Sequence, residues 1–395
     1  MDSLADRDNL SPMQRRLELD IARGLMIVWM TYSHLPTATR SWLNYPFGFV
    51  SSAEGFVFLS ALLVGLIYTK LMGKEGLKAA QDKLLRRVGK LYLYHLGLIL
   101  LLFFGIAPLL DPETRGALAG VAYRYGEVGP FQATFEAALL LHQPPLLDIL
   151  PIYIFFMLAT VPILKVIHAG KFRAILGLSF MLWLGAQFGL KAWFADLERS
   201  ALPSFYPDMR HRGAFDPFGW QFLWFLGLAI GIGWAKGLLP SRERIERWAL
   251  PTIPIILCLA LARHLPDPPL ELSDTRVYFD KWSLGVVRVL NFFLLFPLAL
   301  RAGRFLDEAE LGARFDRLKE SIAKLGRSSL ETYTAHLPLT FIALYAVGED
   351  GGKLAPLPSL IALVSSYLVL YAVALIDEKR KAPPPITPPK AQPAG

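Results

Sequence analysis

Long apolar runs, separated by short polar segments, follow one another along most of the chain. A helix needs roughly 17 to 25 residues to cross about 30 Å of hydrocarbon, and ten runs reach this length. The predicted spans lie near residues 20–39, 47–69, 91–110, 146–166, 174–194, 218–236, 248–264, 283–302, 327–347 and 356–377. The pattern predicts an all-α polytopic membrane protein, a bundle of about ten transmembrane helices forming one domain over residues 1–378.

Three segments depart from this simple pattern. The run 248–264 is short and carries Pro251 and Pro254, so a kinked or re-entrant segment is expected there. In the long connection before the fourth run, residues 131–141 predict an amphipathic helix lying along the membrane surface. Residues 379–395, KRKAPPPITPPKAQPAG, are rich in proline and predict a disordered cytoplasmic tail.

Composition and charge agree with a membrane protein and set its predicted orientation. Charged residues make up 19% of the chain, against about a quarter in soluble proteins. Most of the 41 Lys and Arg residues lie in segments that become cytoplasmic when both termini are placed inside. Because these residues are divided among short loops, nothing indicates nucleic-acid binding. The single cysteine, Cys258, excludes an intrachain disulfide, and no cleavable signal precedes the first run, which is expected to stay as an anchor.

The first run carries two ionisable side chains on one helix face. Arg23 and His34 are eleven residues apart, so they return to within about 20° of each other, roughly 16 Å apart along the axis. An ionisable group within a membrane span costs about 2.5 to 3.5 kcal/mol, which makes it a functional candidate. The alternative is an Arg23 that reaches the membrane interface and a His34 hydrogen-bonded to a neighbouring helix.

Glu54 lies at a similar depth in the second predicted run. A short loop joins the two runs, so their helices should be antiparallel neighbours. Glu54 is therefore predicted to accept a hydrogen bond from one nitrogen of His34, leaving the other nitrogen free as a base. A buried, protonated Glu54 is the alternative.

Further polar residues gather at this outer level. Arg288 is a cation well inside a predicted span and needs an anion, which could be Asp148, Glu54 or an anionic ligand. Taken singly, most of the others are more often hydrogen-bonding contacts between membrane helices than catalytic groups. The candidate substrate-binding residues are Asp148, Trp220, Gln221, Asn291 and His336.

A second cluster, of basic residues, lies at the predicted cytoplasmic ends of the helices. Its usual explanation is the positive-inside rule and contact with anionic lipids, but the same residues could hold the phosphates of a nucleotide-bearing cofactor. The candidate cofactor-binding residues are Arg23, Arg86, Arg87, Lys90 and Arg327. No metal site is expected, because no two potential ligands are closely spaced on one helix.

Several sequence blocks resemble a known family. The block LDIARGLMIVWMTYSH is similar to the first-helix signature of the acyltransferase-3 superfamily, and FVFLSALLVGL resembles its second-helix run, with Ala61 where glycine is usual. A more specific likeness is to the OpgC family of osmoregulated periplasmic glucan succinyltransferases. It is carried by AEGFVFLS, LDILPIYIFFML, DPFGWQFLWFLG and LGRSSLETYTAHL; together with the first-helix block, they extend from the first to the ninth run.

The resemblance implies an enzyme of the bacterial inner membrane with an active cavity open to the periplasm. It would move a succinyl group from cytoplasmic succinyl-CoA, the acyl donor, to hydroxyls of a periplasmic glucan. His34 would act as base or acyl acceptor, Glu54 would orient its ring, and Arg288 would bind the succinyl carboxylate or the oxyanion. Trp220 could stack on a sugar and Asp148 could bind its hydroxyls. An acetyl donor and a glucan transporter or flippase remain as alternatives.

Overall fold

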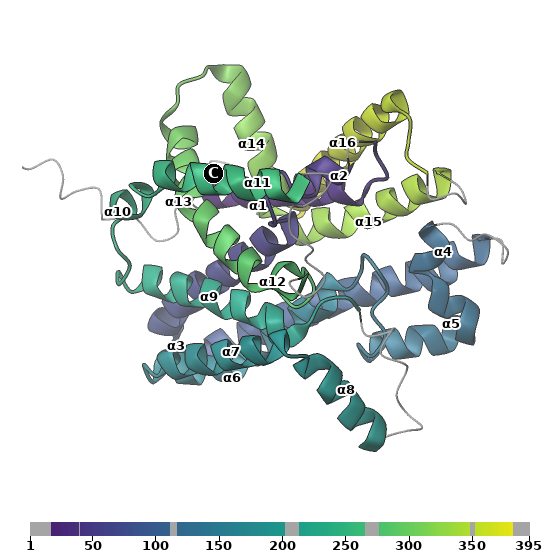
Figure 1. Cartoon of the computed structure of the whole chain (residues 1–395), viewed down its shortest axis with the longest axis horizontal. Helices are drawn as coiled ribbons and strands as arrows, with labels where there is room; N and C mark the ends of the chain where they lie inside the picture. Colours follow the sequence, from purple (N-terminus) through teal and green to yellow (C-terminus); the bar gives the residue numbers. More distant parts are fainter. Residues whose placement is uncertain are drawn as a thin grey trace, which may run out of the picture.

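The structure is a computed structural model, and it describes residues 17–38, 40–110, 117–201, 213–264, 276–347 and 352–381. Within these residues the regular secondary structure is helical, apart from one isolated bridge between Thr37 and Leu354, and turns and loops connect the helices (Figure 1). The helices of the first half are α1 (Leu17–His34), α2 (Arg40–Leu43), α3 (Ser52–Leu100), α4 (Ala117–Val121), α5 (Tyr123–Ala138), α6 (Ile149–His168), α7 (Phe172–Gln187) and α8 (Leu190–Ala201). Those of the second half are α9 (Pro217–Ala235), α10 (Arg242–Glu246), α11 (Ala249–His264), α12 (Arg276–Phe279), α13 (Val286–Glu308), α14 (Ala313–Arg327), α15 (Ser329–Ala346) and α16 (Pro356–Lys381).

The apolar runs predicted from the sequence form helices, and several are long enough to cross a membrane. In the part of the chain that the structure describes, five helices meet the length and hydropathy needed, or six if a bent pair is counted as one span. The five segments are Ser52–Leu109, Ile149–His168, Pro217–Ala235, Val286–Leu306 and Pro356–Lys381. A polytopic membrane protein is therefore supported. The figure of ten spans and the cytoplasmic position of both termini stay predictions.

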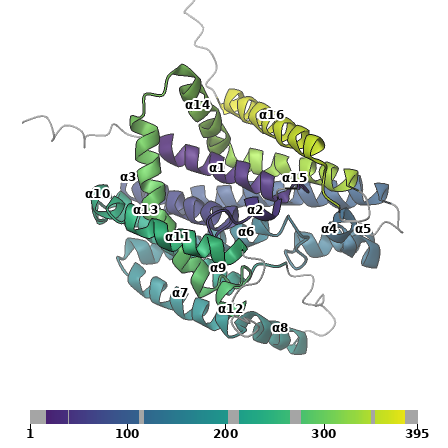
Figure 2. The ribbon, with the colours of Figure 1, turned by 45° about the horizontal axis from the view of Figure 1, so that its top comes forward.

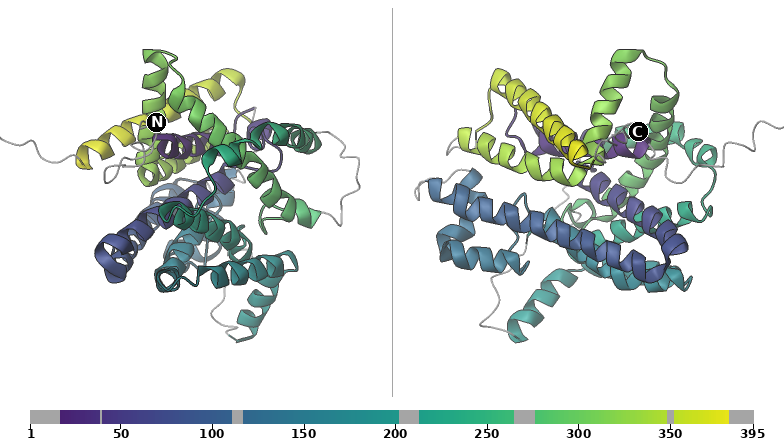
Figure 3. Two further views of the ribbon diagram at one scale, coloured as in Figure 1. Left: turned by 90° about the vertical axis from the view of Figure 1, so that its left-hand side faces the viewer. Right: turned by 180° about the vertical axis from the view of Figure 1, so that it is seen from behind.

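Most of the second and third predicted runs lies on one long helix, α3, which is followed directly by the π-helix η1 (Leu101–Ile106) and the 3₁₀ helix η2 (Ala107–Leu109). Gly76 breaks α3 with φ +85° and ψ 168°, a conformation that glycine adopts without the clash of a Cβ. Tyr68 and Arg87, on opposite sides of the break, interact electrostatically. In a straight helix they would be about 28 Å apart, so the second half of α3 must turn back towards the first (Figure 3).

Three sequence predictions are corrected by the helix boundaries. The run 174–194 is not one straight helix, because α7 and α8 meet at an angle of 83° and Gly189 between them has φ +81°. The segment 313–327 lies between two predicted runs, where no helix is predicted, and it forms the amphipathic helix α14. The last helix, α16, continues through Lys381, so the first residues of the predicted disordered tail are helical; residues 382–395 lie outside the described part.

Helix α14, which is not predicted from the sequence, brings α15 against α1. A Cβ on Gly326 would lie 1.8 Å from the backbone oxygen of Asp20, and one on Gly24 would lie 2.0 Å from that of Ile322. Glycine at both positions therefore lets the two backbones approach, as small residues do between membrane helices. Figure 2 shows α1, α14, α15 and α16 grouped together on one side of the molecule.

A similar close contact joins α3 to α9. A Cβ on Gly231 would lie 2.1 Å from the oxygen of Leu62, and one on Gly65 would lie 2.3 Å from that of Leu228. The fully buried ring of Trp224 packs on α6 instead, against Tyr153 and Phe156. The first half of α3 is thus packed against α9 on one side, while α1 and α15 also contact it. The candidate site is formed where these helices meet.

Candidate active site

His34 at the end of α1 pairs with His336 of α15. Nδ1 of His34 lies 3.0 Å from Nε2 of His336, and the two rings lie edge to edge with their centroids 5.2 Å apart and an angle of 29° between their planes. Nδ1 of His336 contacts the backbone oxygen of Tyr333. A carbonyl can only accept, so this nitrogen carries the proton and Nε2 of the neutral ring accepts from Nδ1–H of His34. The hydrogen-bond network thus assigns the unprotonated lone pair of His34 to Nε2.

Glu54 does not take part in this pair, so the predicted contact between Glu54 and His34 is wrong. Its Oε1 accepts from Nε of Arg288 at 2.8 Å and also contacts Nη2 of Arg288. Its Oε2 accepts from the backbone nitrogen of Ser51 at 3.0 Å and from the Ser51 hydroxyl at 2.5 Å. Both oxygens are occupied, and both side chains of the ion pair are almost fully buried.

The Glu54–Arg288 ion pair shows which anion neutralises Arg288, for which the sequence left Asp148, Glu54 and an anionic ligand open. The sequence predicts that Arg288 needs an anion, and Glu54 of α3 supplies it from across the bundle. Asp148 does not. Because the guanidinium gives two of its N–H groups to Glu54, only Nη1 lacks an acceptor among the described residues. The pair fastens α13 to the N-terminus of α3, where Ser51 and Glu54 form a capping box.

Asp148 and Lys281 are two further charged groups near residues of the site. Asp148, at the N-cap of α6, is buried and accepts from the backbone nitrogen of Ala214 at 3.3 Å. Lys281, in the turn before α13, acts electrostatically on His34 as well as on Asp148. Asp148 also acts on Tyr333, whose ring lies 4.9 Å from that of His336. The charge of Lys281 thus acts on His34, while Asp148 lies near Tyr333, the neighbour of His336.

Two predicted substrate-binding residues are instead used for packing. Trp220 is fully buried, and its indole donates to the backbone oxygens of Lys281 and Trp282 at 3.0 and 3.1 Å. It cannot stack on a sugar. The amide of Gln221 is bonded to Ser179, with the hydroxyl at 2.6 Å and the backbone oxygen at 2.8 Å. Gln221 therefore joins α9 to α7.

Asn291 keeps a free donor near the ion pair. Its Oδ1 accepts from the backbone nitrogen of Phe49 at 2.7 Å. Its Nδ2 is buried and has no acceptor among the residues that the structure describes. A buried amide donor without a partner costs free energy, so Asn291 remains a candidate for ligand binding.

The predicted cofactor cluster divides into paired and unpaired residues. Lys90 bonds Glu331 at 2.6 Å. Arg327 bonds Glu378 at 2.8 Å and also contacts Glu320. These two cations are already neutralised by carboxylates of the chain, so they are weaker candidates for phosphate binding than the sequence suggests.

The other three cations have no carboxylate partner within the described ranges. Arg86 and Arg87 are exposed on α3. Arg23 contacts the hydroxyl of Ser329 through Nη2, while its buried Nε has no acceptor, and the charge of Arg87 acts on Arg23. Two levels of α1 are thus bound to α15, through Ser329 at the Arg23 level and through His336 at the His34 level.

A row of aromatic rings connects these two levels. The ring of Phe56 lies 6.4 Å from that of Tyr153 and 5.8 Å from that of Tyr333. Tyr153 acts electrostatically on Arg23, while Tyr333 packs against His336. All three rings are buried, so side chains rather than open space lie between the basic cluster and the histidines.

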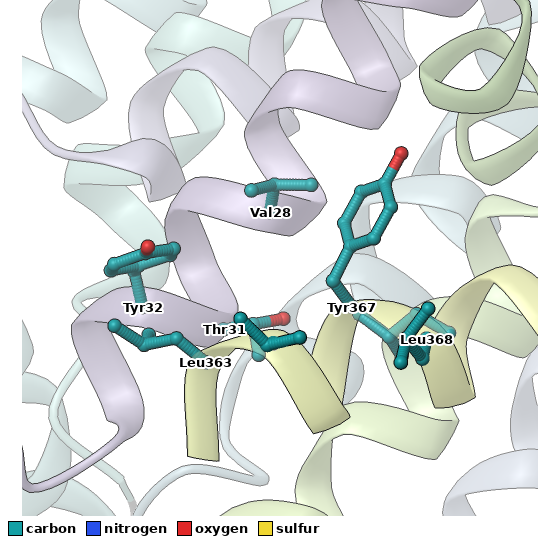
Figure 4. A pocket seen from close by; sticks show the side chains of 8 residues that line it. Val28, Thr31, Tyr32, Leu363, Tyr367 and Leu368 are labelled. Atoms are coloured by element: carbon teal, nitrogen blue, oxygen red, sulfur yellow. The ribbon is translucent and has the colours of Figure 1, made fainter. Parts of the chain in front are cut away.

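A cavity of about 290 Å³ lies elsewhere, between α1 and α16. At 100° per residue, Val28 and Tyr32 point away from the face that carries Arg23 and His34. Figure 4 shows the side chains that line this cavity, which are mostly apolar. The cavity is separate from the candidate active site. It is lined by Val28, Thr31, Tyr32, Leu363, Val364, Tyr367, Leu368 and Leu370.

Three residues of the site are not predicted from the sequence: Lys281, Trp282 and Tyr333. Lys281 and Trp282 stand in the polar connection before a span, in DKWSLG, where a lysine and a tryptophan are ordinary interface residues. Tyr333 stands three residues before His336 in TYTAH, one turn away on the same helix face. The three-residue spacing from His336 could therefore have identified Tyr333 from the sequence. Across residues 17–381, less the undescribed gaps, no cluster of three or more His, Cys, Asp or Glu residues is placed to hold a metal.

Comparison with known proteins adds one finding. The model of a family described as OpgC protein matches residues 15–382 of the chain, which is most of its length and includes every residue of the site above. No curated protein matches the chain. No solved structure matches it either.

Proposed function

The chain belongs to the OpgC family, and from this premise we propose that it is a transmembrane O-acyltransferase. Membership suggests glucan succinylation. The finer proposal is that a succinyl group passes from cytoplasmic succinyl-CoA to a hydroxyl of a periplasmic glucan at His34. The observation that carries the proposal is the pairing of His34 with His336, which leaves Nε2 of His34 as an oriented, unprotonated base.

In the proposed reaction, Nε2 of His34 removes the proton from the sugar hydroxyl. The oxygen attacks the thioester carbonyl, the tetrahedral intermediate collapses, and the C–S bond breaks. The leaving thiolate takes the proton back from Nε2, so His34 ends as it began. The neutral imidazole is the form that acts as a general base. Attack by Nε2 itself, giving an acyl-imidazole, is the alternative order of events.

His336 has a positioning role in this scheme. Its Nε2 holds Nδ1–H of His34, which fixes both the tautomer and the ring plane. When His34 takes up a proton, the positive charge strengthens this hydrogen bond. His336 thus replaces Glu54 in the orienting role expected from the sequence, and the Glu54–Arg288 ion pair is assigned to holding α3 and α13 together.

The unpaired inner cations supply the proposed donor site. Arg86 and Arg87 are exposed and suited to the phosphates of CoA, and the buried guanidinium of Arg23 lies on the same helix as the base, about 16 Å away along its axis. The acyl-bearing arm has to pass Phe56, Tyr153 and Tyr333 to reach His34. Transfer therefore requires these rings to rotate aside when the donor binds.

The decisive experiment uses the purified full-length protein in lipid vesicles with succinyl-CoA and periplasmic glucan, with mass spectrometry of the product. His34→Ala should lower the transfer rate by about 10²- to 10⁴-fold, the usual contribution of a general base. His168→Ala is the matched control. His168 is exposed at the C-terminal end of α6, so this variant should transfer the acyl group at the wild-type rate. Transfer at the wild-type rate by His34→Ala would refute the proposed role of His34.

A further inference from the structure

The turn over residues 280–285, between α12 and α13, is anchored by the ends of two other helices. From α7, the indole of Trp183 donates to the oxygen of Leu284 at 2.8 Å and Gln187 donates to that of Ser283 at 3.0 Å. From α9, Trp220 donates to the oxygens of Lys281 and Trp282. The backbone oxygen of every residue from 281 to 284 is therefore held by a side chain of another helix.

The turn is also held from within. Oδ2 of Asp280 accepts from the backbone nitrogen of Ser283 at 2.6 Å and from its hydroxyl at 2.7 Å. Leu284 has φ +56°, an uncommon conformation for a branched side chain. A Cβ on Gly219 would lie 2.2 Å from the oxygen of Ser283, so α9 touches the turn directly. Because these hydrogen bonds hold the backbone of the turn, the two side chains that point outward from it have fixed positions.

Those two side chains are Lys281 and Trp282. The ammonium of Lys281 lies 5.1 Å from the ring of Trp282 and 5.9 Å from that of Phe215. No carboxylate of the described residues lies within ion-pair distance of it. Trp282 is 43% exposed, so an aromatic face is open beside an unpaired cation.

Lys281 is placed to act at the catalytic pair. Its ammonium lies 5.9 Å from the ring of Phe215, and the backbone nitrogen of Ala214, the preceding residue, donates to Asp148 at the N-cap of α6. The charge of Lys281 also acts on His34 and Asp148. Arg288, the cation that the sequence indicated for a carboxylate, already gives two N–H groups to Glu54. Arg40 of α2 is the other cation that acts on His34, but more weakly than Lys281.

We propose that Lys281 binds the free carboxylate of the acyl group presented to His34, with Trp282 covering its two methylene groups. This inference rests on the proposed function and adds to it the residue that selects a dicarboxylic acyl donor. A carboxylate two methylenes from the thioester carbonyl needs a cation close to the base, and a lysine ammonium is a compact charge suited to it. A monocarboxylic acyl group would leave the ammonium without a partner.

The test compares succinyl-CoA with butyryl-CoA, which has the same number of carbon atoms and a methyl group in place of the carboxylate. The full-length protein in lipid vesicles is assayed with periplasmic glucan as acceptor. Lys281→Met should lower kcat/KM for succinyl-CoA by about 10- to 100-fold, the range for one charge-assisted hydrogen bond. It should leave transfer from butyryl-CoA unchanged or raise it, and Lys281→Arg should keep most of the preference for succinyl-CoA.

Arg40→Met is the matched control and should keep the wild-type preference for succinyl-CoA. An equal loss with both donors in Lys281→Met would overturn the assignment, as would a lost preference in Arg40→Met with none in Lys281→Met. Butyryl transfer by Lys281→Met serves as its own proof of folding. If the wild-type protein transferred neither donor, the proposed function would fail first, so the two failures are distinguishable.

Discussion

His34 donates from Nδ1 to Nε2 of His336 over 3.0 Å, and this bond decides which nitrogen of His34 is free to react. The partner of His336 on the other side is a backbone oxygen, which cannot exchange its role. The backbone oxygen therefore fixes which nitrogen of His336 carries the proton, and His336 in turn fixes which nitrogen of His34 carries it. A single direction of proton transfer follows for the reactive imidazole.

His336→Phe should lower kcat without preventing substrate binding. The ring of His34 would lose its orienting acceptor, and loss of such a supporting hydrogen bond typically costs about 10- to 100-fold. We expect KM for succinyl-CoA to stay near that of the wild-type protein. His336→Gln, whose amide oxygen can accept from Nδ1–H, should recover part of the rate.

The pH dependence of kcat separates this positioning role from a purely structural one. Wild-type activity should fall as the pH drops through the pKa of His34, because protonation of Nε2 removes the base. In His336→Phe the midpoint of that fall should move. A variant with a lower rate at every pH and the wild-type midpoint would contradict a positioning role.

The Glu54–Arg288 ion pair should show the asymmetry of a buried salt bridge. Glu54→Gln leaves Arg288 buried without its counter-ion and should destabilise the protein by about 3–5 kcal/mol. The double variant Glu54→Gln, Arg288→Met removes both charges and should be more stable than the single variant. Thermal unfolding of the purified proteins in detergent measures both.

Acyl transfer by the double variant distinguishes a structural ion pair from a catalytic one. If the pair only holds α3 to α13, the double variant should recover transfer along with stability. Restored stability without transfer would show instead that Arg288 or Glu54 has a direct part in the reaction.

Gly326→Ala should separate α14 from α1. The added Cβ would lie 1.8 Å from the oxygen of Asp20, and overpacking of this kind costs about 1–3 kcal/mol. The start of α15, where Ser329 contacts Arg23, should shift with it. Gly97→Ala in α3 is the control, since a Cβ there meets nothing within 4 Å. Equal thermal stability of the two variants would contradict the close contact.

Replacing Arg86 and Arg87 by glutamine should weaken donor binding. These cations are exposed and lack carboxylate partners among the described residues, so they are available to the phosphates of CoA. We expect KM for succinyl-CoA to rise about ten-fold, more so at low ionic strength, with kcat little changed. Lys83→Gln is the control because Lys83 already pairs with Glu75 at 2.9 Å. A KM that rises as much in the control would refute a specific phosphate site.

The helices could be predicted well from local sequence patterns, but the segments that each helix packs against could not. Runs near 146–166, 218–236 and 356–377 reappear as α6, α9 and α16, because a long apolar stretch has few alternatives to a helix. The bend at Gly189 and the amphipathic helix α14 were missed. Both depend on what the segment packs against, and hydropathy alone carries no such information.

The candidate site shows the same division. From the sequence alone, Arg23 and His34 lie on one face of one helix, because the helical repeat is a local property. Depth in the membrane also placed Glu54, Arg288 and His336 at the level of His34. Several residues at one depth can pair in more than one way, and the choice among them depends on which helices are neighbours.

Only the tertiary structure made that choice. Close contacts through glycine bring α14, and with it α15, against α1, so the partner of His34 is His336, 302 positions along the chain, and not Glu54. Glu54 is left to Arg288. The sequence determined which residues are ionisable and how deep they lie, while the packing of backbones at small residues decided which of them touch.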